Sequence, residues 1–293
     1  MISVAMATYN GEKYLRAQLD SIRNQSVPPD EIVISDDCST DCTAKVVREF
    51  SADTMIPVRF FENTETTGFI RNFHNALAHC EGDIIFLSDQ DDLWMPDRIK
   101  ACVDCFRTHP EVLSLSCRPV ISDEPEKEKI RSGVAALQNV PLKKFLKYPA
   151  YPGMALAVRG SLAREMLEAD NTSAFHDWLL NFLAAQKNGM YHLDMPLVIY
   201  RQHASNTVGS LRAGKKSEKP EKRAEMLSGI VKNISSVYGE DPADPYVKKL
   251  VASFEKRSEL LMAQNAAALF YHDITHLKYL SLKSMAGDLY ALI

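Results

Sequence analysis

Three carboxylates, Asp89, Asp91 and Asp92, follow closely on the apolar run 84–87. A short apolar run that ends in charge is typical of a buried parallel strand, and open α/β sheets bind their ligands at the carboxyl ends of such strands. Asp89 and Asp91 stand two residues apart, so one could ligate a hard divalent cation and its diphosphate while the other reaches a neighbouring group. The alternative is a solvated acidic turn that caps the helix expected to begin near Pro96.

The chain has 293 residues and a formal net charge of −4. This length suggests one large domain or two. Because the net charge is negative, the protein has no overall positive potential that would attract nucleic acid. Local cations or a metal must therefore neutralise any anionic ligand. Residues 1–7 indicate a strand rather than a leader peptide, and no stretch reaches the ~20 apolar residues of a membrane span. We therefore expect a soluble protein on the cytoplasmic side of any membrane, with its cysteines as reduced thiols.

Polar residues follow the strands that the pattern predicts. The apolar runs expected to form the first strands are residues 2–7, 31–35, 58–61 and 84–87. Amphipathic helical stripes separate these runs, and three successive β-α units predict a parallel, doubly wound α/β sheet with right-handed crossovers. In such a sheet Tyr9, Asp37 and Asp89 converge on one edge, which is the geometry of a nucleotide site. The chain has neither a dinucleotide glycine loop nor a P-loop, so a metal and side chains must neutralise any phosphate.

Three of these polar stretches, in this order and spacing, resemble the family 2 inverting glycosyltransferases of GT-A fold. The stretches are Ala7-Thr8-Tyr9-Asn10-Gly11, Ser35-Asp36-Asp37-Cys38-Ser39-Thr40-Asp41 and Ser88-Asp89-Gln90-Asp91-Asp92-Leu93-Trp94. Within that family, the chain is most similar to bacterial rhamnosyltransferases that build surface polysaccharide, through Asn72-Phe73-His74, His176-Asp177-Trp178 and Tyr200-Arg201-Gln202-His203. The resemblance covers about residues 1–210 and implies a mostly parallel sheet with a Rossmann-like nucleotide-binding half.

The resemblance also implies a role for each matching residue. Thr8 and Tyr9 would flank the base of a nucleotide-sugar, Asp37 would accept a hydrogen bond from the pyrimidine ring N–H, Asp89 would approach the ribose, and Asp91 would ligate Mg²⁺ or Mn²⁺. Cys38 and Cys42 depart from the family, which usually carries glycine at both positions. The implied donor is dTDP-rhamnose or a UDP-sugar, and the implied acceptor is a saccharide or a lipid-linked saccharide.

The transfer of a sugar needs a base as well as a metal. A nucleoside diphosphate leaves as an anion, and a divalent ion held by Asp91 would offset that charge. A carboxylate or histidine must also take the proton of the incoming hydroxyl. Asp177 is our candidate, because it opens a helical segment and stands beside Trp178, which could serve as a sugar platform. The alternative is that Asp177 only caps this helix.

Three further side chains are candidates for the charged end of the donor. His203 is expected to contact the metal or a diphosphate oxygen, and Arg201 to pair with phosphate. Arg71 is a second cation candidate near the donor sugar. The alternative for a lone histidine is a surface position or a satisfied core position.

Three other functions stay open at this point. The first is a UDP-hexose transferase of the same fold. The second is a phosphohydrolase that uses Asp89 and Asp91, although such an enzyme would need its paired aspartates at the first strand and a downstream lysine. The third is a non-catalytic sugar-nucleotide-binding module, which would have no need for Asp91 and Asp177 together.

The composition changes near residue 210. We expect a GT-A catalytic domain over residues 1–210, with a nucleotide-sugar-binding half (1–95) and an acceptor or catalytic half (96–210), and a helical C-terminal region over 211–293. The helical patterns lie at residues 226–237, 247–261 and 266–292. These helices are expected to pack on the catalytic domain or on a second subunit as a homo-oligomer. A peripheral role at the inner face of the cell membrane is the alternative.

Overall fold

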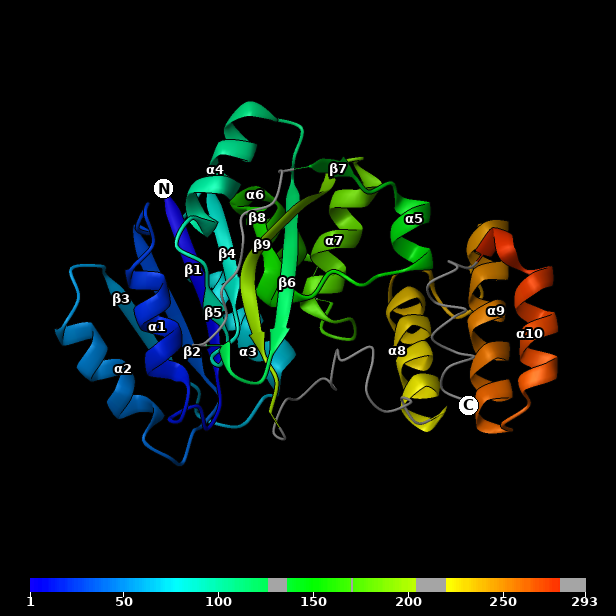
Figure 1. Ribbon diagram of the computed structural model, residues 1–293, viewed down its shortest axis with the longest axis horizontal. Coiled ribbons are helices and arrows are strands. Elements are labelled where there is room, and N and C mark those ends of the chain that lie inside the picture. The colour runs from blue at the N-terminus through cyan, green and yellow to red at the C-terminus, as the bar shows by residue number, and fades with distance from the viewer. Residues whose placement is uncertain (126–135, 170, 204–219, 280–293) are drawn as a thin grey trace. The chain divides into compact units, whose positions relative to one another are not determined.

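The computed structural model describes residues 1–125, 136–169, 171–203 and 220–279, and they form two compact units (Figure 1). The sheet unit comprises residues 1–141, 151–172 and 176–210. Of the described residues, 142–150, 173–175 and 220–279 belong to the helical unit. The domain boundary predicted at residue 210 lies outside the described residues and stays a prediction.

Four parallel strands form the first half of the sheet, in the order β3-β2-β1-β4. The strands are β1 (Ile2–Thr8), β2 (Glu31–Asp36), β3 (Val58–Glu62) and β4 (Ile84–Ser88). The connecting helices are α1 (Leu15–Arg23), α2 (Thr43–Ala52) and α3 (Phe69–Ala78). Every residue of β2 is buried, as expected of a strand that helices cover on both faces. The predicted β-α order of this half is confirmed.

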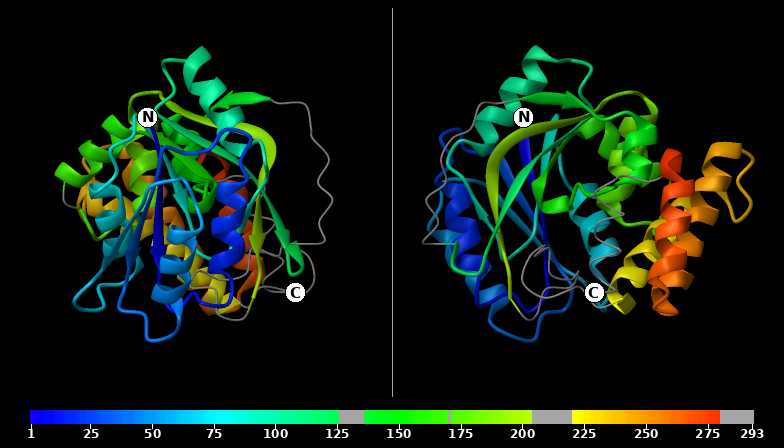
Figure 2. Two further views of the ribbon diagram at one scale, coloured as in Figure 1. Left: turned by 90° about the vertical axis from the view of Figure 1, so that its left-hand side faces the viewer. Right: turned by 45° about the vertical axis from the view of Figure 1, so that its right-hand side comes forward.

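The second half of the sheet mixes strand directions. β8 (Leu156–Arg159) lies between β4 and β6 (Ser114–Ser122) and is antiparallel to both. The long β9 (Met190–Arg201) runs parallel beside β6, with which it forms a twisted pair (Figure 2), and antiparallel to β5 (Leu93–Trp94) and β7 (Leu137–Asn139). The mostly parallel sheet is thus confirmed for β1 to β4 and for the β6–β9 pair. Antiparallel neighbours need no helical crossover, so the helix and strand periodicity could not reveal them.

Helices cover both faces of the sheet. α1 packs beside α2 on one face, and α3 packs with α6 and α7 on the other, because the chain reverses its direction across the sheet between β3 and β4. The remaining elements of this unit are α4 (Arg98–Thr108), the 3₁₀ helix η2 (Gly153–Ala155), α6 (Gly160–Glu168) and α7 (His176–Gln186). Leu15, Leu19 and Ile22 on α1 are fully buried, as their spacing predicted.

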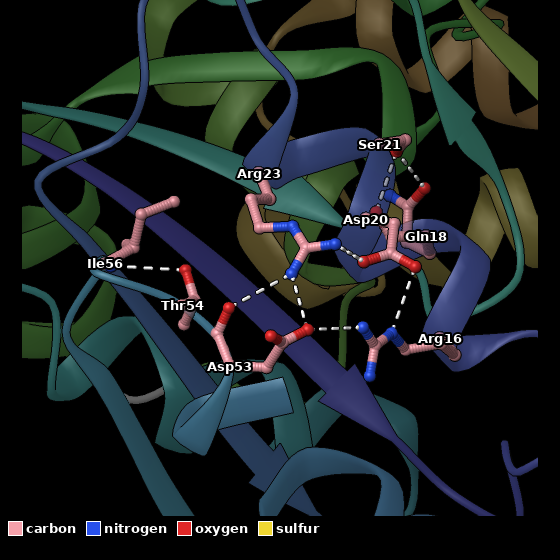
Figure 3. A network of polar contacts seen from close by, with 8 residues as sticks. All are labelled: Arg16, Gln18, Asp20, Ser21, Arg23, Asp53, Thr54 and Ile56. Atoms are coloured by element: carbon pink, nitrogen blue, oxygen red, sulfur yellow. Dashed lines mark hydrogen bonds and ion pairs between the residues drawn. The ribbon is translucent and has the colours of Figure 1, made fainter. Parts of the chain in front are cut away.

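A network of ion pairs joins α1 to the residue that follows α2 (Figure 3). Asp53 Oδ2 accepts from Arg16 Nη2 and from Arg23 Nη1, each at 2.9 Å, and Asp20 pairs with the same two arginines. These side chains are at least partly exposed, so each pair contributes only about 0–1 kcal/mol. Together they fix the position of α1, which begins shortly after the end of β1.

The helical unit is built from α-helices that pack on one another. Its elements are α5 (Leu142–Lys147), α8 (Pro220–Tyr238), α9 (Pro245–Met262), α10 (Ala266–Thr275) and the 3₁₀ helix η3 (Leu277–Tyr279). The third helix predicted from the sequence ends earlier than expected, at Thr275, and the remainder of that prediction from 280 onward lies outside the described residues. In the described part of the chain, no helix has both the length and the apolarity needed to cross a membrane.

Candidate functional site

The loop after β4 gathers three carboxylates at the carboxyl end of that strand. Asp89, Asp91 and Asp92 each offer an oxygen within 4.8 Å of the others. Asp92 is fully buried, and its Oδ2 has no hydrogen-bond partner among the described residues. An unpartnered buried carboxylate oxygen is costly, and a hard cation bound to this cluster would reduce the charge repulsion that surrounds it. The donor set therefore fits Mg²⁺ or Mn²⁺, and it includes Asp92, for which the sequence pattern predicted no role.

Burial and nearby negative charges raise the pKa of Asp89 and of Asp92. For Asp89 the pKa rises to about 7, first because of burial and then because of the nearby charges of Asp91 and Asp177. For Asp92 burial, followed by the charges of Asp89 and Asp91, raises the pKa well above its ordinary value. The cluster is thus poised to release protons when a cation binds.

A buried arginine lies behind the acidic loop. Arg98 is 0% exposed, its guanidinium stacks over the Trp94 ring at 3.9 Å, and its Nη2 donates to the carbonyl oxygens of Leu87 and Leu156. Its positive charge acts to lower the pKa of both Asp89 and Asp92, although burial outweighs this effect. Sequence reasoning missed Arg98, because an arginine at the start of a helix gives no signal that the fold will bury it.

The end of β9 holds the acidic loop from its other side. His203 Nε2 lies 2.8 Å from Asp91 Oδ2, so the two predicted metal ligands are brought together. Arg201 donates from its backbone N–H to Asp92 Oδ1 at 3.0 Å and from Nε to the Asp91 carbonyl at 2.8 Å. Both Arg201 and His203 pack against the Tyr14 ring. The structure thus gives Arg201 a contact with the loop backbone, and its pairing with phosphate stays a prediction.

The predicted base-binding residues lie at the ends of β1 and β2. Thr8 is buried, and its Oγ1 donates to Asp36 Oδ1 at 2.7 Å. The Tyr9 side chain is exposed, with 52% of the residue accessible, so it is free to meet a base. Its backbone N–H and C=O both bond the side-chain amide of Gln90.

Asp37 holds the loop that precedes α3. Its Oδ1 accepts from the Thr67 N–H, the Thr67 hydroxyl and the Asn63 amide, and its Oδ2 accepts from the Gly68 N–H. Burial acts to raise the pKa of Asp37, but these hydrogen bonds outweigh it and the pKa is lowered. The carboxylate therefore stays charged, which suits an acceptor, and its contact with a pyrimidine N–H stays a prediction.

Two residues of the loops that follow β1 and β2 adopt left-handed backbone conformations. The φ angle is 48° at Asn10 and 61° at Cys38. Asparagine tolerates this region, whereas a cysteine there is strained and glycine would be relaxed. Glycine, which the resemblance implies at the position of Cys38, would adopt this φ without strain. Cys42, at φ −83°, needs no such residue.

Asp177 occupies the first turn of α7. Its Oδ2 accepts from the Gly153 N–H at 2.9 Å and its Oδ1 from the Trp178 N–H at 2.7 Å. Burial raises its pKa against the effect of these two hydrogen bonds, which makes the carboxylate a better base. Asp177 is also close enough to Asp89 to raise the pKa of Asp89. Asp177 therefore lies within electrostatic range of Asp89, and its role as the base stays a prediction.

The sugar-platform role of Trp178 is wrong. Its indole is only 5% exposed and stacks on Phe182 with ring centroids 5.0 Å apart, because α7 turns this face into the core. The buried neighbour of Asp177 is instead His176, which stacks on Phe73 at 4.0 Å. Burial, with nearby His74, lowers the pKa of His176 to about 3, so this imidazole is neutral.

Arg71 is the one predicted site residue that the structure does not tie to the others. It lies in the first turn of α3 with an exposed side chain and makes no ion pair among the described residues. Its exposure leaves it available to a ligand, and its role stays a prediction.

The family follows from comparison with known proteins. Residues 3–163 match the family described as Glycosyl transferase family 2. Over 219 residues the chain is 31% identical to the dTDP-rhamnosyl transferase RfbG of Shigella flexneri, a match that covers 70% of this chain and 74% of that protein. The chain belongs to glycosyltransferase family 2, and the predicted family is confirmed.

Solved structures establish the fold class. S. aureus TarS in complex with UDP-GlcNAc superposes with a TM-score of 0.63 at 17% identity, covering 100% of this chain and 81% of that chain. The mannosyltransferase PcManGT from Pyrobaculum calidifontis, in complex with GDP-Man and Mn²⁺, gives a TM-score of 0.58 at 21% identity. This match covers 99% of this chain and 85% of that chain. The predicted GT-A fold is therefore confirmed.

Proposed function

We propose that this protein is a metal-dependent, inverting glycosyltransferase of bacterial cell-surface polysaccharide synthesis. It moves a sugar, with L-rhamnose favoured, from a nucleoside-diphosphate donor to a saccharide or lipid-linked saccharide acceptor on the cytoplasmic side of the membrane. The observation that carries the proposal is the cluster of Asp89, Asp91 and Asp92, with His203 bonded to Asp91 and Asp177 close enough to influence Asp89.

The donor is held by residues at the carboxyl ends of β1, β2 and β4. Tyr9 presents an exposed ring to the base next to the buried Thr8, and the charged Asp37 accepts from the ring N–H. Asp89 approaches the ribose. Arg71, exposed at the start of α3, is available to the donor sugar.

Asp91 and His203 hold the cation. When bound, Mg²⁺ or Mn²⁺ offsets the negative charge that develops on the leaving diphosphate. The imidazole and the carboxylate are already in hydrogen-bond contact, so few side-chain rotations are needed to present both to one cation. Arg201 keeps the Asp91 backbone in place beneath them and adds positive charge close to the phosphates.

Asp177 removes the proton from the acceptor hydroxyl. Its two backbone hydrogen bonds fix the carboxylate in one orientation, and its raised pKa favours uptake of a proton. Attack by that hydroxyl on the face opposite the diphosphate inverts the anomeric centre in one displacement. The neutral His176 beside it adds no positive charge that would weaken the base.

A panel of donors tests the proposal. We expect Mn²⁺-dependent transfer or slow hydrolysis of dTDP-rhamnose, read by loss of donor and by release of dTDP, and no release of phosphate from simple phosphate esters. Turnover of UDP-hexoses without turnover of dTDP-rhamnose would assign the donor to the alternative, a UDP-hexose transferase. The favoured sugar rests on the likeness to the dTDP-rhamnosyl transferase RfbG. Phosphate release from esters would instead support a phosphohydrolase.

The helical unit supplies a contact surface. Phe270, Tyr271 and Ile274 on α10 are large and exposed. Such side chains support contact of this unit with a second subunit or with the membrane surface. Light scattering of the full chain, and co-sedimentation with anionic vesicles, separate the two.

A further inference from the structure

Gln90 pairs with both backbone groups of Tyr9 across a separation of 81 residues. Its Oε1 accepts from the Tyr9 N–H at 2.9 Å and its Nε2 donates to the Tyr9 carbonyl at 2.9 Å. A primary amide that bonds an N–H and a C=O of one residue reproduces the pairing of a β-ladder. The loop after β4 is therefore attached to the end of β1 in a defined register.

Gly11 provides the space for this amide. A Cβ atom on Gly11 would lie 2.2 Å from Gln90 Oε1 and 2.7 Å from Gln90 Cδ. The backbone of Gly11 has no positive φ, so the need for glycine here is steric and comes from Gln90. The chain after Tyr9 is thus shaped to receive the Gln90 side chain.

The paired residues belong to different halves of the site. Gln90 stands between Asp89 and Asp91, whereas Tyr9 borders the base-binding surface. A nucleoside diphosphate must reach both places at once. Once one end of the ligand is bound, the effective concentration of its other end at the second place is higher when the separation of the two places is fixed than when it varies.

We infer that Gln90 is a positioning residue that couples nucleoside binding to metal binding, an inference that rests on the proposed function. Gln90 holds Tyr9 against the loop that carries Asp89 and Asp91. The nucleoside half of the site, at Tyr9, and the metal half, at that loop, then form a single preorganised surface. Its contribution lies in the thermodynamic coupling between the two halves rather than in contact with the reacting atoms.

The exposure of the pair argues against a mainly structural role. Tyr9 is exposed and Gln90 is only partly buried, so water can replace both hydrogen bonds when the amide is removed. Under those conditions an intramolecular hydrogen bond contributes little to folding. Loss of the amide should then change the position of Tyr9 relative to the loop after β4, with little change in the free energy of unfolding.

Gln90→Met tests the inference, because methionine keeps the length of the side chain and removes both hydrogen bonds. Calorimetry should compare dTDP and UDP binding with and without Mn²⁺, together with thymidine or uridine alone and Mn²⁺ alone. We expect Mn²⁺ to tighten nucleoside diphosphate binding in the parent protein, and we expect this tightening to fall by ~10-fold in Gln90→Met, within the usual range of coupling between sites. Nucleoside alone and Mn²⁺ alone should each bind within about 2-fold of the parent, since each occupies one half.

Gly11→Ala provides a second, independent perturbation. Its methyl group displaces only the flexible end of Gln90, so the protein should fold while the amide leaves Tyr9. The coupling should fall as in Gln90→Met, and the double variant should lose no more than either single variant. Asn139→Ala is the matched control, because Asn139 is also a half-buried amide that bonds two backbone carbonyls, those of Asn188 and Met190.

The outcomes separate the inference from the proposed function. If Mn²⁺ does not tighten nucleoside diphosphate binding in the parent protein, the proposed function fails. If the parent shows tightening and Gln90→Met keeps it in full, the inference is wrong and the proposed function stands. Additive losses in the double variant, or an equal loss in Asn139→Ala, would also overturn the inference.

Discussion

His203 Nε2 lies 2.8 Å from Asp91 Oδ2, although the two residues are 112 positions apart in the chain. The contact joins the loop that follows β4 to the residues that follow β9, and both side chains are mostly buried. An imidazole and a carboxylate in contact at the edge of an acidic cluster are a suitable pair of ligands for Mn²⁺.

Asp91→Asn should nearly abolish transfer and remove the metal-dependent part of nucleotide binding, because an amide lacks the charge that a hard cation needs. Calorimetry of dTDP and UDP with and without Mn²⁺ measures the effect. Asp104→Asn, which removes an exposed acid of α4 that pairs with Lys100 and Arg107, is the control and should change nothing. Equal metal dependence in Asp91→Asn and the parent would contradict the assignment.

Asp177→Asn should lower kcat by roughly 10²-fold or more and leave donor binding little changed, because the amide cannot accept the acceptor proton. Proton NMR of the new linkage should show inversion, so that a β-L-rhamnosyl donor gives an α-L product. A retained configuration would exclude Asp177 as the base of a single displacement.

The helix-cap alternative for Asp177 has its own control. Asp244 caps α9 by accepting from the Tyr246 and Val247 N–H groups, and it has no predicted part in transfer. Asparagine would keep this cap, so Asp244→Ala is the variant that removes it; it should lower the melting temperature, by the loss of about 0.5–2 kcal/mol, without lowering kcat. If Asp177→Ala loses stability and donor binding while Asp177→Asn keeps kcat, Asp177 is only a cap.

The contribution of Asp89 to the free energy of unfolding without metal should fall as the pH rises from about 4 to about 7. The pKa of Asp89 is raised to about 7 in the folded protein, while an unfolded aspartate titrates near about 4, so the folded state binds more protons in this window. Asp92 contributes with the same sign. The protonated Asp89 is the stable form, and its stabilisation is lost as the pH rises through the folded pKa.

Melting temperatures of the parent and of Asp89→Asn between about pH 5 and about pH 8 measure this contribution. Asp89→Asn should flatten the decline, and Mn²⁺ should stabilise the parent more at the upper end of the range, where the carboxylates are ionised. His176 has the opposite sign, because its pKa is lowered to about 3 and its stabilisation is lost as the pH falls below that of a free histidine. The His176 contribution is the same in both proteins, so it cancels when the melting temperature of Asp89→Asn is subtracted from that of the parent. If melting temperature depends on pH in the same way in both proteins, the Asp89 assignment is wrong.

Asp37→Ala should weaken the binding of free nucleoside and also lower the melting temperature, because the Asn63–Gly68 loop loses its acceptor. Asp41→Ala is a matched control, since Asp41 likewise holds a loop by accepting from the Glu12 and Thr43 backbones. Both variants should lose stability, and only Asp37→Ala should lose affinity for thymidine and uridine. Equal nucleoside binding in the two variants would remove Asp37 from the base site.

The first half of the fold could be predicted because its signals are local. The runs that form β1 to β4 end in polar residues, and the spacing of the helices between them leaves room only for parallel crossovers. Asp89, Asp91 and Asp37 follow from their places at strand ends. Their convergence needs no knowledge of side-chain packing.

The remaining features depend on tertiary packing, which periodicity does not describe. The burial of Trp178 comes from the packing of α7, and the burial of Arg98 comes from its stacking on Trp94. Gln90 stands between two acids whose chemistry is more conspicuous, and its pairing with Tyr9 appears only when β1 and β4 lie side by side. The antiparallel β8 needs a partner on each side, so no local pattern reveals it.

The long β9 has a consequence for the biosynthesis of the protein. β5 leaves the acidic loop and pairs with β9, and His203 follows the end of that same strand. A ribosome releases the chain from its amino end, so β1 to β4 can assemble while β9 is still to be translated. Until then the acidic loop has neither its histidine nor the strand that anchors it. A nascent or truncated chain that ends before β9 can therefore form β1 to β4, but it lacks His203, so the proposed metal site is completed only late in synthesis.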